Sequence, residues 1–450
     1  MAALDFTPIQ QAGDIQGISR PSLSYWQDAW IRLKANRRAL FSLYIIIGLL
    51  LFTFIGPLLW QVDPAQQDVN QISQPPLADR TVTLVPDYTP WTPQSAPATD
   101  GLAFAEPPNT QVVRLHWTAL PEADQYRVYR NLYPIGPEGV LGLPLFETSA
   151  EQTYFEDRLD LKPRTYYYSV VALNAQGQET EHVHFAETSL NRVITLAEAQ
   201  ERGLIDADQT AEPGTQFKYA LHPLGTDYLG RDMLARLMHG ARVSLFIGFF
   251  APLLYVLIGV VYGSTAGFLG GATDQVLMRF ADFVVALPFL LFMILFKVAF
   301  GIGPGESGIA PMLIALVLLG WPATARLVRG QILQIREEGY ISASTLLGAK
   351  TNYLVMRHMI PNTMGVILVT VTFAVPSAIF TEAFLSFIGM GVAPPTPSWG
   401  SMCNEGIKTM QSTPHELIFP ALLISITVLA FNLLGDGLRD ALDARMRNRE

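Results

Sequence analysis

Residues 336–362, REEGYISASTLLGAKTNYLVMRHMIPN, are a polar stretch between two strongly apolar runs of the sequence. The stretch contains five charged side chains, or six with His358, and the two glycines Gly339 and Gly348. Connections of this length are uncommon without a function. The stretch is therefore expected to have a function, and the alternative is an ordinary connecting loop.

This stretch contains small and apolar side chains that could form one short rigid element. Gly348 permits the positive φ that a sharp turn requires. Glu337 and Glu338 offer carboxylates at the start of this element. We expect an apolar ridge formed by Tyr340, Ile341 and Leu347, and small side chains for close approach at Ser342, Ala343 and Ser344.

No motif in the sequence supplies catalytic or nucleotide-binding chemistry. A G-x-x-x-x-G-K-[ST] segment is missing, so we expect no ATP binding by this chain. The seven histidines are scattered, and Cys403 is the single cysteine, so no Cys/His cluster has the spacing of metal ligands. We expect no enzyme activity, metal or cofactor in this chain, and no nucleic-acid partner.

The composition indicates that membrane helices position the polar stretch. Half of the residues are hydrophobic and 15% are charged, whereas soluble chains carry about a quarter charged residues. Apolar runs of roughly 20 residues can cross a hydrocarbon core of about 30 Å, and they must be helical because lipid cannot pair backbone polar groups. We expect an all-α polytopic membrane protein with six transmembrane helices, near 39–60, 244–268, 276–300, 309–329, 362–388 and 417–435.

Lys and Arg in the flanks predict the orientation of these helices. Basic residues precede the first run and follow the last run, which places both termini in the cytoplasm. They are Arg32, Lys34, Arg37, Arg38, Arg439, Arg445, Arg447 and Arg449. Within the cytoplasmic segment 1–38, Trp and basic residues predict a helix at the lipid surface, and a plain basic flank is the alternative.

The segment 61–221 differs from the rest of the chain. Residues 61–220 contain 10 basic and 22 acidic residues, a net charge of −12, and we expect them outside the cytoplasm because they follow the first span. After a Pro-rich linker come short runs rich in β-branched and aromatic residues, such as VVRLHW, QYRVYR and TYYYSVVAL. These runs predict a β-sandwich of about 80–90 residues.

Residues 104–190 resemble a fibronectin type III domain, through LHW, ADQYRVYR and LDLKPRTYYYSVVALNAQGQET. The resemblance implies that Trp117 is the core Trp of the sandwich. It also implies that Tyr167 occupies the tyrosine corner, where the hydroxyl ties a loop back to a strand. Such modules are usually spacers or docking surfaces, so we assign no chemistry to this one.

Residues 222–450 resemble the C-type permease subunit of oligopeptide and dipeptide ABC importers. The resemblance is carried by HPLGTDYLGRDMLARLMHGARVSLFIGF, GGATDQVLMRFADFVVALP, LSFIGMGVAPPTPSWGSM and FPALLISITVLAFNLLGDGLRDALDAR. It also covers most of 25–60, whereas the insertion lies outside it. It implies the type I importer permease fold.

The resemblance implies that 330–361 is the EAA coupling loop of such importers. The family pattern would consist of a coupling helix, a turn and a second helix that enters the next span. Two departures, Ser342 for the usual Glu and Ser344 for the second Ala, shift docking toward shape or toward the nearby acidic residues. The matching positions are Ser342, Ala343, Ser344, Gly348, Ile360 and Pro361.

The resemblance also implies partners. The chain would form a translocation pathway with a homologous permease in the plasma membrane, in contact with membrane lipid. Two cytoplasmic ATPase subunits, which bind ATP and Mg, would dock on the coupling loops, and an extracytoplasmic binding protein would deliver peptide. The alternatives are a nickel or metal-chelate importer of the same family, and a membrane receptor that does not transport.

Glu382 is an acidic residue within the fifth apolar run. A charge at the centre of a bilayer costs about 2.5–3.5 kcal/mol on insertion scales, so it requires an explanation. One interpretation is that Glu382 lines the pathway or braces a gate. The other is structural hydrogen bonding.

Overall fold

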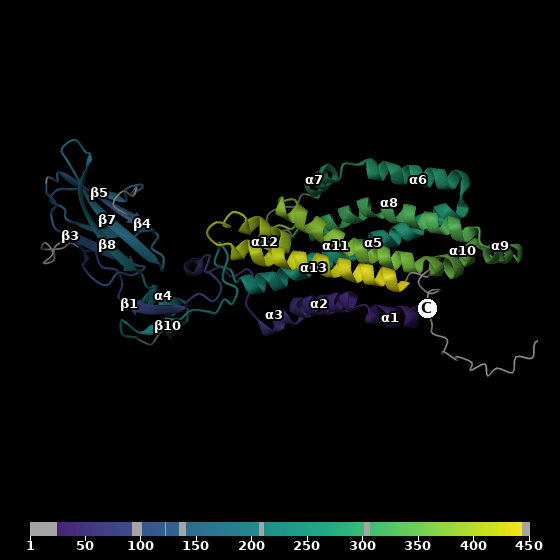
Figure 1. Cartoon of the computed structure of the whole chain (residues 1–450), viewed down its shortest axis with the longest axis horizontal. Coiled ribbons are helices and arrows are strands. Elements are labelled where there is room, and N and C mark those ends of the chain that lie inside the picture. Colours follow the sequence, from purple (N-terminus) through teal and green to yellow (C-terminus); the bar gives the residue numbers. More distant parts are fainter. Residues whose placement is uncertain are drawn as a thin grey trace, which may run out of the picture. The chain divides into compact units, whose positions relative to one another are not determined.

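The computed structural model describes residues 25–91, 101–121, 123–134, 141–206, 211–300 and 307–442. Its contacts divide the chain into two compact units, one built from helices and one containing the strands (Figure 1). Met1–Ala78 and His222–Glu450 form the helical unit, and Asp79–Leu221 form the β unit. The expected helical polytopic membrane protein with an inserted β region is thereby confirmed.

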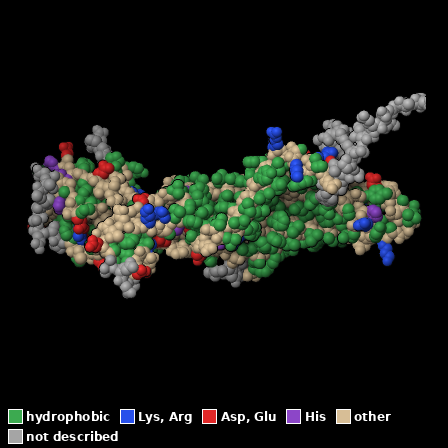
Figure 2. Space-filling view, turned by 90° about the horizontal axis from the view of Figure 1, so that it is seen from below, with side chains coloured by type: hydrophobic (Ala, Val, Ile, Leu, Met, Phe, Trp, Pro, Cys, Tyr) green, Lys and Arg blue, Asp and Glu red, His purple; other side chains and the backbone are tan. Residues whose placement is uncertain are grey.

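Five helices within the described ranges are long and apolar enough to cross a membrane. Hydrophobic side chains cover the face of the helical unit that Figure 2 shows, as a lipid-facing surface requires. Exposed examples on the first of these helices are Phe41, Leu51 and Phe54. The helices lie side by side in Figure 1 and are α2 (Arg37–Phe54), α5 (Met233–Leu269), α8 (Ile309–Arg336), α11 (Ile360–Phe387) and α13 (His415–Leu442).

A bent helix pair, α6 (Gly271–Ala286) and α7 (Phe289–Ala299), stands where the sequence predicts the third span, at 276–300. The two helices are bent by 82° at the break. Proline disfavours helical backbone at the residue before it, and Leu287, which precedes Pro288, is extended with φ −69° and ψ 125°. With the pair counted as one span, the described residues contain up to six spans, the expected number.

Three glycines of α5 at intervals of four residues bring its backbone against α8. A Cβ added at Gly259 would lie 2.6 Å from the Cβ of Thr324, and one at Gly267 would lie 2.9 Å from the carbonyl oxygen of Arg329. Between them, Gly263 faces the backbone of Ala325. Small residues at this spacing let two membrane helices approach closely, so α5 and α8 pack backbone to backbone.

Shorter helices complete the helical unit. α1 (Tyr25–Ala35) lies within the segment 1–38, where the sequence predicts a helix. Its Ala29 and Leu33 are buried, whereas Trp30 and Ile31 are exposed. Its position at a lipid surface stays a prediction. The remaining short helices outside the loop after α8 are α3 (Gly56–Leu59), the 3₁₀ turn η1 (Val69–Gln71) and α12 (Trp399–Gly406).

The compact insertion begins later than the sequence suggests, at Asp79 rather than at residue 61. Residues 61–78 belong to the helical unit because their backbone is bonded to the segment that follows the β unit. The N–H of Ser73 donates to the carbonyl of Asp227 at 2.8 Å, and the N–H of Gln74 donates to Oγ1 of Thr226 at 2.8 Å.

The β unit contains a small mixed sheet with strand order β10–β1–β9. Buried Val82, Leu84, Ile194 and Tyr219 form the core beneath it, together with one side of a short helix. A capping box at Thr195 starts this helix. The elements are β1 (Thr81–Val85), β9 (Val193–Thr195), α4 (Leu196–Glu201) and β10 (Gln216–Lys218).

The rest of the β unit is a sandwich of two sheets, with strand orders β2–β3–β6 and β5–β4–β7–β8. Residues from both sheets, including Trp117 and Val170, share one buried core. The likeness to fibronectin type III domains stays a prediction. The strands are β2 (Leu102–Phe104), β3 (Val113–Trp117), β4 (Gln125–Asn131), β5 (Phe146–Ser149), β6 (Tyr154–Asp157), β7 (Thr165–Leu173) and β8 (Glu179–Ser189).

Trp117 is fully buried in this core, as the sequence predicts, but the prediction for Tyr167 is wrong. Side chains alternate along β7, so Tyr166 and Tyr168 enter the core and Tyr167 faces the other side, where it is half-buried. The tie expected of a tyrosine corner is made by Tyr166, whose hydroxyl accepts a hydrogen bond from the N–H of Lys162 at 3.0 Å.

Candidate functional site

The predicted coupling loop folds as a helix, a turn and a second helical stretch that enters a membrane helix. α9 (Gly339–Leu346) ends before Gly348, whose φ is +84°. The N–H of Ala349 donates to the carbonyl of Ser344 at 3.1 Å, and that of Gly348 donates to Thr345 at 3.0 Å, which is a Schellman ending. The chain continues as α10 (Thr351–Leu354), a π-helical turn (Val355–Met359) and α11.

The exposed apolar surface of α9 differs from the predicted ridge. Tyr340 and Leu347 are exposed, but Ile341 is only 2% exposed and packs with Ile332 and Met359 of the helical unit. Leu346, which the sequence reasoning missed, is 89% exposed beside Leu347 at 88%. Leu346 follows Ile341 by five residues, and on a period of about 3.6 residues these two positions lie on different faces of a helix. Ile341 therefore holds α9 on the helical unit, and Leu346 and Leu347 form an exposed tip.

Polar contacts fix the orientation of α9. The hydroxyl of Tyr340 accepts a hydrogen bond from Nδ2 of Asn362 on α11 at 2.8 Å. Oγ of Ser344 donates to the carbonyl of Tyr340 at 2.8 Å. The other predicted residues lie on exposed surface, and they are Glu337, Glu338, Ser342, Ala343 and, at the start of α11, Pro361.

Glu382 lies 22 residues after Ile360 on α11, roughly 33 Å along the helix at about 1.5 Å per residue. The structure therefore separates it from the coupling loop. Its fully buried carboxyl accepts hydrogen bonds from Oγ of Ser244 on α5 at 2.7 Å and from Oγ of Ser386 at 2.8 Å. Oγ of Ser244 also accepts a bond from the N–H of Trp399, at the start of α12, at 3.2 Å. These contacts favour the structural interpretation of Glu382.

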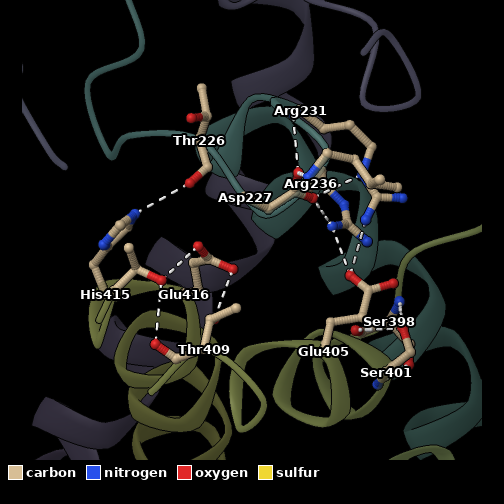
Figure 3. A network of polar contacts seen from close by, with 12 residues as sticks. Thr226, Asp227, Arg231, Arg236, Ser398, Ser401, Glu405, Thr409, His415 and Glu416 are labelled. Carbon is tan, nitrogen blue, oxygen red and sulfur yellow. Dashed lines mark hydrogen bonds and ion pairs between the residues drawn. The ribbon is translucent and has the colours of Figure 1, made fainter. Parts of the chain in front are cut away.

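A buried charge network joins the segment before α5 to α12 (Figure 3). Arg231 pairs with Asp227 at 2.7 Å and with Glu405 at 3.0 Å. Arg236 pairs with the same two carboxylates, at 2.8 Å for Glu405. Buried charges are tolerated when they are paired, and two guanidinium groups here balance two carboxylates. The sequence signal was the set of charges in GTDYLGRDMLAR, next to an apolar helix, and we assigned it no role.

Further hydrogen bonds extend this network to the first residues of α13 and to the end of the first span. Nε2 of His415 lies 3.1 Å from the carbonyl oxygen of Thr226. Asp232 caps the N-terminus of α5 by accepting from the N–H of Ala235 at 2.6 Å. It also accepts from Nε1 of Trp60 at 3.1 Å and lies 2.7 Å from Nδ1 of His222. This end of the helical unit is therefore fixed by contacts between distant parts of the sequence.

Comparison with known proteins identifies the helical unit. Residues 259–448 match the family of binding-protein-dependent transport system inner membrane components, and residues 24–76 match the N-terminal transmembrane domain of oligopeptide transport permease C. The oligopeptide transport system permease protein OppC of Bacillus subtilis is 50% identical over 226 residues, which are 50% of this chain and 72% of that protein. The chain belongs to the OppC and DppC family of permeases.

Two further relatives have different names. The dipeptide transport system permease protein DppC of Bacillus subtilis is 48% identical to this permease over 227 residues, 50% of this chain and 69% of that protein. The glutathione transport system permease protein GsiD of Pectobacterium atrosepticum is 41% identical over 227 residues, 50% of this chain and 74% of that protein. At these identities the family is settled and the substrate is open.

Membership in this family makes the permease a multi-pass inner-membrane protein and a subunit of an ABC importer. This subunit is not itself catalytic. The alternative of a membrane receptor that does not transport is thereby excluded. The predicted coupling loop and Glu382 both lie within the matched residues 259–448. The β unit lies between the two matched ranges, so neither family model covers it.

Proposed function

We propose that this permease forms the translocation pathway of an ATP-driven importer of oligopeptides or dipeptides, together with a homologous permease. The observation that carries the proposal is the exposed tip formed by Leu346 and Leu347. Buried Ile341 and a Schellman turn hold this tip rigidly. The chain that presents it is 50% identical to an oligopeptide permease over 226 residues. A membrane subunit that receives work from a partner needs such a rigid exposed element.

In this proposal, two ATPase subunits dock on the coupling loops from the cytoplasm, and a binding protein delivers peptide from the other side. ATP binding and hydrolysis by the partners would shift the permease pair between two conformations. Close approach of a partner at α9 is possible because Ser342 and Ala343 are small and exposed. Glu337 and Glu338, also exposed, would supply the carboxylates that Ser342 lacks.

A peptide substrate is favoured over nickel or a metal chelate because the relatives above are named for oligopeptide, dipeptide and glutathione transport. Glutathione is the second candidate, supported by the 41% identity to the GsiD permease.

Uptake by the complete transporter tests the proposal. The permease would be purified with its bound partners, the partners identified by mass spectrometry, and the complex reconstituted into proteoliposomes. We expect ATP-dependent accumulation of a labelled tripeptide such as trialanine. Accumulation of glutathione or Ni²⁺ without peptide would overturn the peptide assignment. A purified complex without ATPase subunits would overturn the coupling role.

A further inference from the structure

The β unit contains a cavity, and the residues that line it lie outside both ranges that match known families. Its volume is about 400 Å³, and its walls come from residues 83–89, 106–114 and 191–193. Pockets for small molecules measure about 300–1,000 Å³, so the cavity is large enough for a ligand of a few residues. The wall segments belong to the small sheet and to the β2–β3 side of the sandwich, both within one compact unit.

Arg114 makes one wall of this cavity rigid. Its guanidinium is almost completely buried and donates to the carbonyl of Thr89 at 2.6 Å, while it pairs with Glu156 at 2.9 Å and with Glu106 at 3.0 Å. The ring of Tyr88 lies 5.9 Å from the guanidinium carbon. Because Arg114 is already paired with two carboxylates, it offers little positive charge to a ligand.

Hydrogen bonds to the backbone also fix the part of the wall around Asn109. Oδ1 of Asn109 accepts hydrogen bonds from the N–H groups of Gln111 at 2.8 Å and Val112 at 3.1 Å. The N–H of Thr110 donates to the carbonyl of Asn191 at 3.2 Å. The cavity is thus preformed, which lowers the entropic cost of binding.

The lining favours a cationic ligand with amide groups. Its charged residues are Glu106 and Arg114, which pair with each other, and Asp87, which is exposed, so Asp87 leaves the lining with a net negative charge. The amide side chains of Asn109, Gln111 and Asn191 supply donors and acceptors for the peptide groups of a ligand. The apolar part of the wall is formed by Pro86, Tyr88, Pro107 and Pro108.

We propose that this cavity binds the free ammonium end of a short peptide, with Asp87 as the carboxylate that pairs with the ammonium. The choice of a peptide rests on the proposed function, whereas the preference for an ammonium group rests on the charges of the wall. The β unit would then hold substrate on the permease itself, in addition to the binding protein that the family uses.

Calorimetric titration of the full-length permease in lipid nanodiscs, without its partners, tests this. Trialanine is the probe. We expect N-acetyl-trialanine to bind about tenfold more weakly, because a charge-assisted hydrogen bond is lost. Asp87→Asn should lower the affinity for trialanine to the same extent. Gln111→Trp fills the cavity and should abolish binding. Glu151→Gln, an exposed acidic residue outside the lining, is the control and should change nothing.

Equal affinity for trialanine and its acetylated form would overturn the ammonium assignment, and equal affinity for ethylamine would overturn the peptide assignment. Binding that Asp87→Asn and Gln111→Trp leave unchanged would place the ligand elsewhere in the permease. Uptake in proteoliposomes separates the two proposals. Uptake without binding at the cavity overturns only this inference, and cavity binding without uptake overturns only the proposed function.

Discussion

Oγ of Ser244 on α5 donates a hydrogen bond to the carboxyl of Glu382 on α11 at 2.7 Å, and both side chains are fully buried. Because Ser244 also accepts from the N–H of Trp399, one hydroxyl connects two membrane helices and the start of α12. The carboxyl of Glu382 is therefore part of the packing between helices.

Glu382→Ala should destabilise the permease by about 1–3 kcal/mol, since buried hydroxyls would lose their acceptor. Ser244→Ala is the matched change on α5 and should lower the thermal midpoint in the same direction. Glu382→Gln keeps an acceptor and should retain most of the stability. If Glu382→Gln abolishes uptake while the thermal midpoint stays at the wild-type value, the pathway interpretation is correct instead.

The tip of α9 and its anchor should respond differently to mutation. Replacing Leu346 and Leu347 with Ser, or Ala343 with Glu, changes only exposed surface, so we expect lost ATPase association and uptake at unchanged thermal stability. Ile341→Ala removes a buried side chain and should cost about 2–5 kcal/mol of stability. Co-purification of the ATPases and thermal unfolding measure the two effects. Wild-type uptake by the double Ser variant would refute the docking role of the tip.

The glycines of α5 predict a sharp steric effect. Gly263→Val places a branched side chain against the backbone of Ala325, so α5 and α8 must separate. We expect a loss of monodisperse protein in size-exclusion chromatography after extraction. Gly330→Val on α8 is the control, because no atom lies within 4 Å of its added Cβ. Similar behaviour of both variants would show that helix propensity, rather than the contact, is responsible.

The basic flanks predict the orientation of the permease in the membrane, and cysteine labelling can test it. In a Cys403→Ser background, we expect Gln176→Cys in the β unit to react with an impermeant maleimide in intact cells. Asn352→Cys in the coupling loop should react only after the membrane is opened. Both positions are exposed, so access to the reagent depends on the side of the membrane. The reverse pattern would invert the proposed topology.

The β unit should lose stability at alkaline pH. Burial raises the pKa of Tyr168, whose hydroxyl donates to Asp157 at 2.7 Å, and raises the pKa of Tyr129 to about 12. Unfolded tyrosine loses its proton near pH 10, whereas the folded unit keeps it. The stabilising contribution is therefore complete below about pH 10 and falls as the pH rises further.

The urea midpoint of the isolated 79–221 fragment measures this dependence. We expect it to fall between about pH 10 and about pH 12, and Tyr168→Phe should make the fall smaller, because one of the groups with a raised pKa is gone. A midpoint that stays constant over this range would contradict the expectation.

Sequence patterns predicted the elements that depend on local chemistry. The apolar runs predicted the spans, and Gly348 predicted the turn because positive φ is costly for other residues. The predictions were wrong where they had to say which face of a strand or helix a side chain occupies. Tyr167 was off by one position on a strand in which neighbouring residues point in opposite directions, and Ile341 was placed on the wrong side of a short helix.

Contacts between distant segments could not be read from the sequence. The pairing of Arg231 and Arg236 with Glu405 joins residues more than 165 positions apart, and no local pattern announces it. The same is true of the bond between Ser244 and Glu382. The bend at Leu287 had a local cause in Pro288, but no local pattern predicts its size of 82°.

The hydrogen bonds from Ser73 and Gln74 to Asp227 and Thr226 close the helical unit at the base of the insertion. The chain leaves the helical unit and returns to it at neighbouring points, whatever lies between. A gene for a permease of this kind can therefore acquire, lose or exchange the segment 79–221 as a cassette, and its membrane part keeps the same fold. Selection can then act on the inserted module independently of the transport machinery.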